Sequence, residues 1–362
     1  LYLISDVASD KGNTYYVFDR GETAKISECC RLSFKLEEAD LLDAKEPWRM
    51  RYCALQNVSL NLPRLAYMAK NDDTKLMNLI TDRFILAVKA HKEKRVFMEK
   101  LLSLGENGPL ALLTMNRDGM PYLRFNHASH LIGMVGLNEM VQIHTGEEMH
   151  SSKRALKFGL KVIAHMKILT DKMRRQENMK IVLEQTPAES TSYRFARLDL
   201  RYFSPHAGRV MKGDIASGEV YYTNSTHLNV KHAMNPIERV TTEGLFHPLI
   251  EAGSISHVWL GEAKPSKEAI ADFVIKTFKH TTNDQIAFSP EFTTCNKCHR
   301  TARGLADACS YCGSTDVDGI TRITGYFTKV SSWNKGKLGE LKDRYRNVEF
   351  FPRENPKAAA ND

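Results

Sequence analysis

Hydrophobic and polar positions along the chain alternate in patterns that predict β-strands followed by amphipathic helices. The run from Val58 to Leu62 alternates at strand spacing, and Pro63 then stands where the first turn of a helix tolerates a missing N–H. A second helix is predicted where apolar residues recur at helical spacing, at Leu156, Leu160, Ile163 and Met166. The segment "MKIVLEQ", residues 179–185, predicts the strand that follows this helix.

Later segments continue the alternation. "SGEVYYTNST" (217–226) and "SISHVWLGE" (254–262) are predicted strands, and "DQIAFSPE" (284–291) is predicted to be a last short strand. Between the last two, "KPSKEAIADFVIKTFKHT" predicts a helix with Ser266 as its N-cap. Strands that alternate with long helices predict an α/β fold with a parallel sheet or barrel, whose polar site residues lie on loops at strand ends.

The composition is that of a globular protein, with 362 residues, 42% hydrophobic residues and a formal net charge of +8. This charge is compatible with nucleic acid, nucleotide phosphates or an acidic partner. Lysines and arginines are spread along helical faces such as "KAHKEKRVFMEK", however, which favours a solvated surface. The chain has no run of 18 apolar residues, and "LYLISDVASDKG" lacks the layout of a signal peptide. We therefore expect a soluble cytoplasmic protein with no membrane partner.

Four of the seven cysteines form a block with the spacing C-x₂-C, ten residues, C-x₂-C. Two residues between thiolates allow one tight turn to present both sulfurs to one ion, so two such turns supply a tetrahedral set suited to zinc. A disulfide pair or an iron–sulfur site is the alternative interpretation. A zinc ion held by four cysteines has no open coordination position, so we expect a structural role for Cys295, Cys298, Cys309 and Cys312.

Directly after this block, "TRITGYFTKVSSWNKGK" (321–337) places Gly325 in the pattern Arg-Ile-x-Gly-Tyr. Taken together with "ECCRL", "NLPRLAY", "GEEMHSSKRALKFGL", "TPAES", "YYTNSTHLNV" and "GLFHPLIEAGSISHVWLGE", it resembles the C-terminal part of the anaerobic, class III ribonucleotide reductases. These are glycyl radical enzymes that convert ribonucleotides to deoxyribonucleotides for DNA precursor synthesis. The order and number of the segments make the resemblance specific.

The resemblance implies a fold and a division of the chain. Residues 1–290 would form the C-terminal half of a ten-stranded α/β barrel, with a finger loop at about residues 28–62. Residues 291–348 would form a small zinc-binding and glycyl radical region, and residues 349–362 a polar tail. The first half of the barrel is not recognisable in this sequence, so we expect the chain to need an N-terminal half for turnover.

The resemblance also implies the radical chemistry. Gly325 would store a radical, formed by a separate activase that uses S-adenosylmethionine and a [4Fe–4S] cluster. A cysteine would pass the radical to the substrate ribose, and Cys30, followed by Arg31, best matches the family's Cys-Arg motif. Its neighbour Cys29 and, as second choice, Cys53 remain open, since a free cysteine is by default a small buried hydrophobe.

Several further residues are candidates for contacting the substrate, a ribonucleoside triphosphate. Asn61, or Asn57 before it, could hydrogen-bond ribose hydroxyls, although Asn61 could equally cap a helix. The segment at Thr186, Ala188, Glu189 and Ser190 precedes a predicted helix whose N-terminus could hold phosphate, with Glu189 more readily a capping charge than an acid or base. Four polar residues at another predicted strand end either line the site or form a loop network: Tyr222, Asn224, Ser225 and His227.

The remaining expectations concern partners and alternatives. The resemblance implies a homodimer in the full enzyme, and formate or a thioredoxin-like protein as the reductant. Two other interpretations remain open: a pyruvate formate-lyase-like glycyl radical enzyme, which would lack the four-cysteine block, and a non-enzymatic zinc-ribbon protein that binds nucleic acid.

Overall fold

The chain forms two compact units in the structure, a computed structural model that describes residues 1–20, 25–27, 33–35, 43, 45–116 and 119–351. The first unit comprises Leu1–Phe18, Pro187–Pro248 and Ser254–Asp362, and the second comprises Asp19–Thr186 and Leu249–Gly253. None of the helices in the described part of the chain combines the length and the apolar character needed to cross a bilayer.

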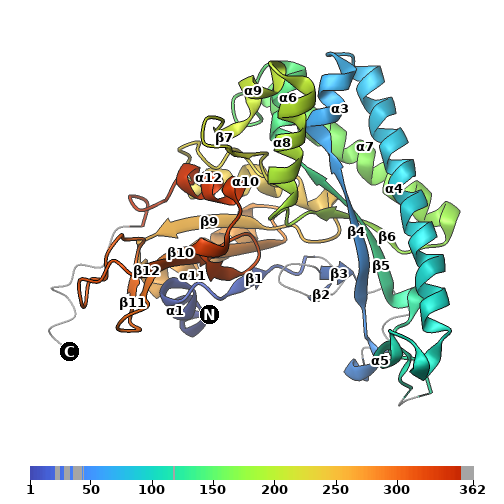
Figure 1. Ribbon diagram of the computed structural model, residues 1–362, viewed down its shortest axis with the longest axis horizontal. Helices are drawn as coiled ribbons and strands as arrows, with labels where there is room; N and C mark the ends of the chain where they lie inside the picture. Colours follow the sequence, from blue (N-terminus) through green and yellow to red (C-terminus); the bar gives the residue numbers. More distant parts are fainter. Residues whose placement is uncertain (21–24, 28–32, 36–42, 44, 117–118, 352–362) are drawn as a thin grey trace. The chain divides into compact units, whose positions relative to one another are not determined.

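The second unit contains a parallel sheet in the order β4-β5-β6 (Figure 1). These strands are Cys53–Asn61, Ala128–Val135 and Ile181–Gln185. Helices follow the strands: α3 (Leu62–Ala69), α4 (Asp73–Leu102), α6 (Leu137–Thr145) and α7 (Lys153–Glu177). The hydrophobic pattern predicts the helix after Pro63 and α7, but it did not single out β5 or α6. The smaller elements are β2 (Lys25–Ser27), β3 (Ser33–Lys35) and α5 (Ala111–Thr114).

The segment after Pro63 forms two helices, α3 and α4. Pro63 lies in the first turn of α3, as predicted, and Asn61 is the N-cap. The chain then turns at Lys70 and Asn71, which have φ values of 54° and 64°. Asp72 starts α4 by accepting a hydrogen bond from the Lys75 N–H at 2.9 Å. The left-handed backbone at the two turn residues separates the helices because the next N–H groups cannot continue the helical ladder.

The first unit is built around β9 (Ser256–Gly261) and β10 (Gln285–Cys295), which pair in parallel. Strand β10 also pairs antiparallel with β1 (Tyr15–Val17), β11 (Thr301–Arg303) and β12 (Val317–Arg322), and β12 pairs with β13 (Phe327–Lys329). Helices α1 (Tyr2–Asp10) and α11 (Lys267–His280) pack on this sheet, and Ser266 caps α11 as predicted. Their shared core includes Val258, Ile270, Phe273, Ile286 and Phe288.

Two strand predictions in the first unit require correction. "SGEVYYTNST" contains only a short strand, β8 (Glu219–Tyr221), which pairs antiparallel with β7 (Lys212–Asp214) and so lies outside any parallel sheet. "DQIAFSPE" is the beginning of β10, which has 11 residues and is followed by three more strands. The pairing with β9 shifts register between Ser289 and Pro290, and this irregularity accommodates the proline inside a long strand.

The first unit also contains α8 (Thr191–Phe203), α9 (His206–Val210), α10 (Pro236–Gly244) and α12 (Lys335–Asp343). Helix α12 begins at Lys335, with Asn334 as its N-cap. The domain boundary expected between residues 290 and 291 falls inside β10, within a single unit.

Two buried histidines lie between β5 and α4 in the second unit. His130 and His91 are at most 1% exposed, and their rings meet edge to face with centroids 5.5 Å apart. Burial, together with the nearby His91 and Arg95, lowers the pKa of His130 to about 4. Burial also lowers the pKa of His91, whose Nε2 lies 2.9 Å from the Leu131 carbonyl oxygen. Both rings are therefore neutral at pH 7.

This neutral pair makes the second unit sensitive to acid. We expect its free energy of unfolding to fall by ~3 kcal/mol as the pH is lowered from 6.5, the ordinary histidine pKa, to about 4, the pKa of folded His130. Over this pH range the unfolded His130 binds a proton that the folded one does not. This contribution is complete above pH 6.5, and below pH 4 no more is lost. Hydrogen exchange of β5 peptides in urea measures the effect. His130→Gln should flatten the dependence, and a variant with the wild-type pH profile would contradict this assignment.

Candidate functional site

The four cysteines of the predicted metal site converge in the structure. Their Sγ atoms all lie within 4.8 Å of one another, with Cys295 and Cys312, and likewise Cys298 and Cys309, 3.6 Å apart. Each C-x₂-C pair, Cys295 with Cys298 and Cys309 with Cys312, lies on a tight turn. His299 after the first pair and Gly313 after the second adopt left-handed φ values of 58° and 71°. The Gly313 N–H donates to the Cys309 carbonyl, which closes the second turn.

The electrostatics of this cluster suit a bound cation. Hydrogen bonds from the Tyr311 and Cys312 N–H groups lower the pKa of Cys309 to about 6. A hydrogen bond from the Cys298 N–H likewise lowers the pKa of Cys295. A hydrogen bond from Ser314 favours ionisation of Cys312, but burial and the other three sulfurs outweigh it and raise the pKa of that thiol to about 11. Sulfurs that hinder one another's ionisation in this way are stabilised by a divalent ion.

The same geometry argues against the disulfide alternative. None of the cysteines in the described part of the chain forms a disulfide, and sulfurs 3.6 Å apart are well beyond the ~2.05 Å of a disulfide bond. Four thiols in a closed set, each pair on its own turn, could hold a metal ion, and this donor set is the one typical of structural zinc.

Gly325 is buried in the bend that joins β12 to β13. Its carbonyl oxygen accepts a hydrogen bond from Arg322 Nη1 at 2.8 Å. On the other side of the bend, the Ile323 N–H donates to the Tyr326 carbonyl at 2.9 Å. The backbone of Gly325 does not lie in the left-handed region, in contrast to Gly313. The turn conformation alone therefore does not explain why this residue is glycine.

The Gly325 bend is braced by three buried charged residues of α12 and its C-terminal end. Arg344 donates to the carbonyls of Arg322 and Ile323, each at 2.9 Å, and to Glu340 at 2.8 Å. Lys337 donates to the other oxygen of Glu340 at 2.6 Å. Burial raises the pKa of Glu340, but Lys337 and Arg344 outweigh it, so the pKa stays below its ordinary value and the carboxylate is charged.

Arg344 is also held by aromatic rings. Its guanidinium carbon lies 3.9 Å from the ring centroid of Trp259 on β9 and 5.3 Å from that of Trp333. These contacts orient the guanidinium so that its N–H groups point at the bend. Sequence patterns did not single out Lys337, Glu340 or Arg344, since helical spacing i, i+3 and i, i+4 is equally common on solvated helix faces.

A small cavity borders the bend within the first unit. It is lined by residues that include Asn224, His227, His257, Trp259, Ile323 and Thr324, and its volume is about 20 Å³. The predicted site residue Asn224 reaches the bend, because its Nδ2 donates to Thr324 Oγ1 at 3.4 Å. The Oδ1 atom of Asn224 is buried and accepts no hydrogen bond from the described residues. A cavity of this size accommodates about one water molecule and not a nucleotide.

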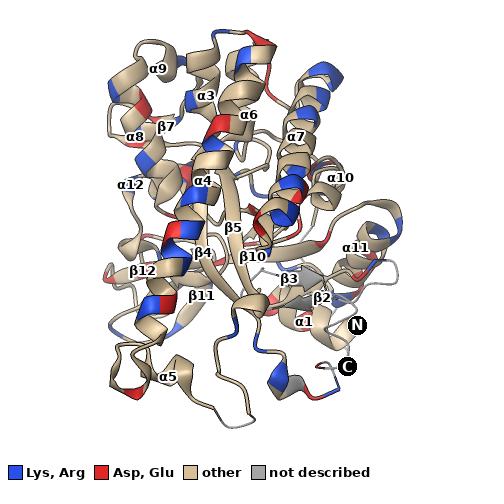
Figure 2. Ribbon diagram, turned by 90° about the vertical axis from the view of Figure 1, so that its right-hand side faces the viewer, with Lys and Arg blue, Asp and Glu red and all other residues tan. Residues whose placement is uncertain are grey.

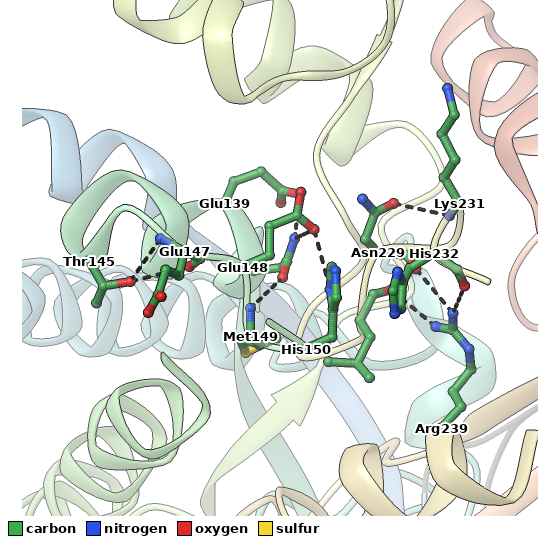
Figure 3. Close-up of polar contacts among 12 residues, drawn as sticks. Glu139, Thr145, Glu147, Glu148, Met149, His150, Asn229, Lys231, His232 and Arg239 are labelled. Atoms are coloured by element: carbon green, nitrogen blue, oxygen red, sulfur yellow. Dashed lines mark hydrogen bonds and ion pairs between the residues drawn. The ribbon is translucent and has the colours of Figure 1, made fainter. Parts of the chain in front are cut away.

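The loop that carries Asn224 and Ser225 is fixed by a buried ion pair on α10. Arg239 donates to the carbonyls of Asn229 and His232 at 3.1 and 3.0 Å (Figure 3), and it lies 3.5 Å from Glu243. Glu243 in turn accepts a hydrogen bond from the Leu228 N–H at 3.1 Å. Sequence reasoning missed this pair. The loop network that it proposed for these residues is present, and a substrate role for them stays a prediction.

In the second unit, other predicted residues gather at the carboxyl ends of the parallel strands. Asn61 ends β4, and its Oδ1 accepts a hydrogen bond from the Arg64 N–H at 3.3 Å, so it caps α3. Thr186 follows β6 and lies 3.0 Å from Ser59 Oγ, which donates to Asn57 Oδ1. A Cβ at Gly133 would overlap Thr186 Oγ1, so any larger residue there would displace the Thr186 side chain. Strand ends of this kind are where open α/β sheets bind ligands.

The segment "GEEMH" has a clear structural role in the same unit. Asn138 at the start of α6 is fully buried, and its Nδ2 donates to Glu148 Oε2 at 3.2 Å. Its Oδ1 accepts from the Met149 N–H at 3.1 Å (Figure 3). These contacts hold the turn between α6 and α7.

The remaining predicted residues have different outcomes. Cys29 and Cys30, with Arg31, lie outside the described residues. Cys53 is half-buried at the start of β4 and is not part of a disulfide. Ala188, Glu189 and Ser190 precede α8, where Ser190 is the N-cap without a side-chain cap bond. Asn334 Nδ2 donates to the Glu189 carbonyl at 2.8 Å, which ties this segment to the start of α12.

Comparison with known proteins identifies a family. The family model described as "Anaerobic ribonucleoside-triphosphate reductase" matches residues 1–346. Proteins of that name from Escherichia coli K12 and phage T4 are each 26% identical to this chain over 80% of its length. The chain spans 42% and 48% of those two proteins, less than half of each.

Solved structures agree with the fold. A structure titled "Anaerobic ribonucleotide reductase" has a TM-score of 0.64 and 21% identity, and the match covers 82% of this chain and 45% of that one. A Thermotoga maritima anaerobic ribonucleotide reductase, solved with dATP bound in the specificity site, has a TM-score of 0.60 and 21% identity, covering 78% and 44%. The mixed α/β fold of this chain is thus similar to the fold of these reductases.

Proposed function

Because this chain belongs to the anaerobic ribonucleoside-triphosphate reductase family, we propose that it is the part of such an enzyme that stores the radical and contributes to nucleotide reduction. The observation that carries the proposal is the position of Gly325. It lies buried one bend beyond β12, the strand whose first residue, Val317, pairs with the metal-site residue Cys295. The cysteine cluster and the glycine therefore share one antiparallel sheet.

Glycine suits a stored radical for a chemical reason. An unpaired electron at a glycine Cα is shared with the amide nitrogen on one side and the carbonyl on the other. Without a Cβ, the centre becomes planar with no steric clash. In the activated protein, Gly325 would lose one Cα hydrogen atom to the adenosyl radical of an S-adenosylmethionine and [4Fe–4S] activase, leaving the glycyl radical and 5′-deoxyadenosine.

The radical then has to reach the substrate through a cysteine. In the proposal, Cys30 gives its thiol hydrogen to the Gly325 radical, and the resulting thiyl abstracts the ribose 3′ hydrogen. The 2′ hydroxyl takes up a proton and leaves as water. Formate, oxidised to carbon dioxide, or a thioredoxin-like protein, oxidised to its disulfide, would supply the two electrons, and the cysteine thiol would return the hydrogen atom to C3′. Asn61 and the strand-end residues beside Thr186 are proposed to hydrogen-bond the triphosphate substrate, and the backbone before α8 to hold its phosphates.

The four-cysteine cluster is proposed to bind zinc, which would supply rigidity to the sheet whose β12–β13 bend carries Gly325. The proposal also includes an N-terminal half that completes a ten-stranded barrel, and a homodimer. It further includes a cytoplasmic location, since free thiols persist in reducing compartments.

The alternatives receive less support. A pyruvate formate-lyase-like enzyme does not account for the cysteine cluster, and the family match favours the reductase. Nucleic-acid binding would require a continuous basic stripe. Acidic residues interrupt the basic ones along α4 (Figure 2), where for example Arg95 pairs with Glu99.

The test of the function combines spectroscopy with turnover. The chain, together with its N-terminal half, is incubated anaerobically with activase and S-adenosylmethionine. We expect a glycyl doublet in the electron paramagnetic resonance (EPR) spectrum and reduction of a ribonucleoside triphosphate. Absence of the doublet in a metal-loaded, folded protein would contradict the proposal.

The relay has its own test in a pair of cysteine variants. Cys30→Ser is expected to keep the glycyl doublet but lower turnover by at least ~10³-fold, because serine's stronger O–H bond does not exchange hydrogen with the glycyl radical. Cys53→Ser is the matched control and should retain turnover. The reverse result in the two variants would transfer the relay to Cys53.

A further inference from the structure

Arg322, the last residue of β12, places a buried positive charge at the carbonyl of Gly325. Its side chain is 1% exposed, and Nη1 donates to the Gly325 carbonyl oxygen at 2.8 Å. The same guanidinium donates to the Tyr15 hydroxyl and to the Gly12 carbonyl. An arginine on this strand could equally have extended into solvent, so its inward direction requires an explanation.

The guanidinium is held between two aromatic rings. Its central carbon lies 4.6 Å from the Tyr15 ring centroid and 4.7 Å from that of Phe327. Gly12 contributes through its backbone, where only glycine fits: its φ is +73°, and a Cβ at this position would overlap the Pro290 ring. Rings on two sides and carbonyls at its edge fix the plane of the guanidinium, so the Nη1–H aimed at Gly325 is preorganised.

Such a donor acts on the radical more strongly than on the intact glycine. In the glycyl radical, electron density moves from the amide nitrogen through Cα to the carbonyl oxygen. A cation that is hydrogen-bonded to that oxygen stabilises this charge shift, and it does so most effectively where water is excluded. Lys329, on strand β13 of the same hairpin, carries the same charge but is exposed to solvent.

We propose that Arg322 is a positioning residue that tunes the Gly325 radical, lowering the free energy of the radical relative to intact glycine through its hydrogen bond to the Gly325 carbonyl. This inference rests on the proposed function, because it requires a radical at Gly325. The consequence for the reaction is that hydrogen exchange with the relay cysteine favours storage on Gly325 between turnovers.

The test measures the radical itself. Arg322→Gln and Arg322→Lys are prepared in the assembled reductase, with Lys329→Gln as the control that removes one charge from the same hairpin. High-field EPR, normalised per spin, should show an increased largest g-value in Arg322→Gln, since loss of the donor raises the orbital contribution of the carbonyl oxygen. The anaerobic radical lifetime should shorten about tenfold, as expected for one charge-assisted hydrogen bond. Arg322→Lys should be intermediate, and Lys329→Gln should match the wild type.

A measurement on the wild type avoids any loss of folding in the variants. With ¹⁵N-labelled arginine, electron–nuclear double resonance of the wild-type radical should reveal a ¹⁵N coupling from the nitrogen next to the Gly325 carbonyl. Wild-type spectra without this coupling, or a folded Arg322→Gln with an unchanged g-value and lifetime, would overturn the proposal while leaving the radical function intact. A wild type without any glycyl doublet would overturn both.

Discussion

Replacing Gly325 by alanine is expected to abolish both the glycyl doublet and nucleotide reduction in the assembled enzyme. A methyl group at Cα hinders the planar radical and blocks close approach of the activase's adenosyl radical. The backbone at this position lies outside the left-handed region, so alanine meets no strain from a positive φ. We therefore expect Gly325→Ala to fold and to retain its metal, which separates loss of radical chemistry from loss of structure.

The control for this variant is a glycine that serves only the backbone. Gly313, with a φ of +71°, closes the second cysteine turn, and a Cβ there would meet nothing within 4 Å. Gly313→Ala should cost about 1 kcal/mol in stability and keep the glycyl doublet. A doublet that persists in Gly325→Ala would place the radical on another residue.

Cys295→Ser is expected to remove the bound metal and to destabilise the first unit more than an ordinary core substitution does. Cys295 is both a member of the thiol cluster and the last residue of β10, where it pairs with Val317 of β12. Structural zinc contributes ~10–16 kcal/mol of apparent binding free energy in small zinc-finger peptides, against ~2–5 kcal/mol for a large core truncation. Metal analysis by mass spectrometry and thermal unfolding measure the two effects.

Cys53→Ser is the control for metal content, because Cys53 lies on β4 in the second unit and belongs to no described cluster of metal-ligating residues. It should retain the wild-type amount of zinc. Stoichiometric zinc in Cys295→Ser would mean that the four cysteines are not its ligands.

Features written in local sequence were predictable. The convergence of the four cysteines could be predicted from their spacing, because two residues between thiols restrict each C-x₂-C pair to one tight turn. Pro63 marked the first turn of α3 and Ser266 the start of α11, since both act on the backbone within a few residues. Gly325 was singled out by the family resemblance and not by its local pattern alone, and its radical role stays a prediction; the structure adds that it is buried beside Arg322.

Features that depend on distant partners were not predictable. The full length of β10 was not predicted, because the irregularity that accommodates Pro290 within the strand exists only in the pairing with β9. The antiparallel pairing of β8 depends on β7, and a three-residue strand carries almost no periodic signal. Arg344 braces the bend through hydrogen bonds to the carbonyls of Arg322 and Ile323, which lie 22 and 21 positions earlier in the chain. The sequence of the helix itself does not indicate these contacts.

Strand β10 has a consequence for how this protein can be divided. One end of the strand pairs with β9 in the hydrophobic core, and the other end supplies Cys295 and pairs with β12. A cut near residue 290 would leave both parts of this sheet with an unpaired edge, which is a template for aggregation. The cysteine cluster with its glycine bend therefore cannot be exchanged between relatives as a separate cassette, and any functional transplant has to carry β9 and the whole of β10 with it.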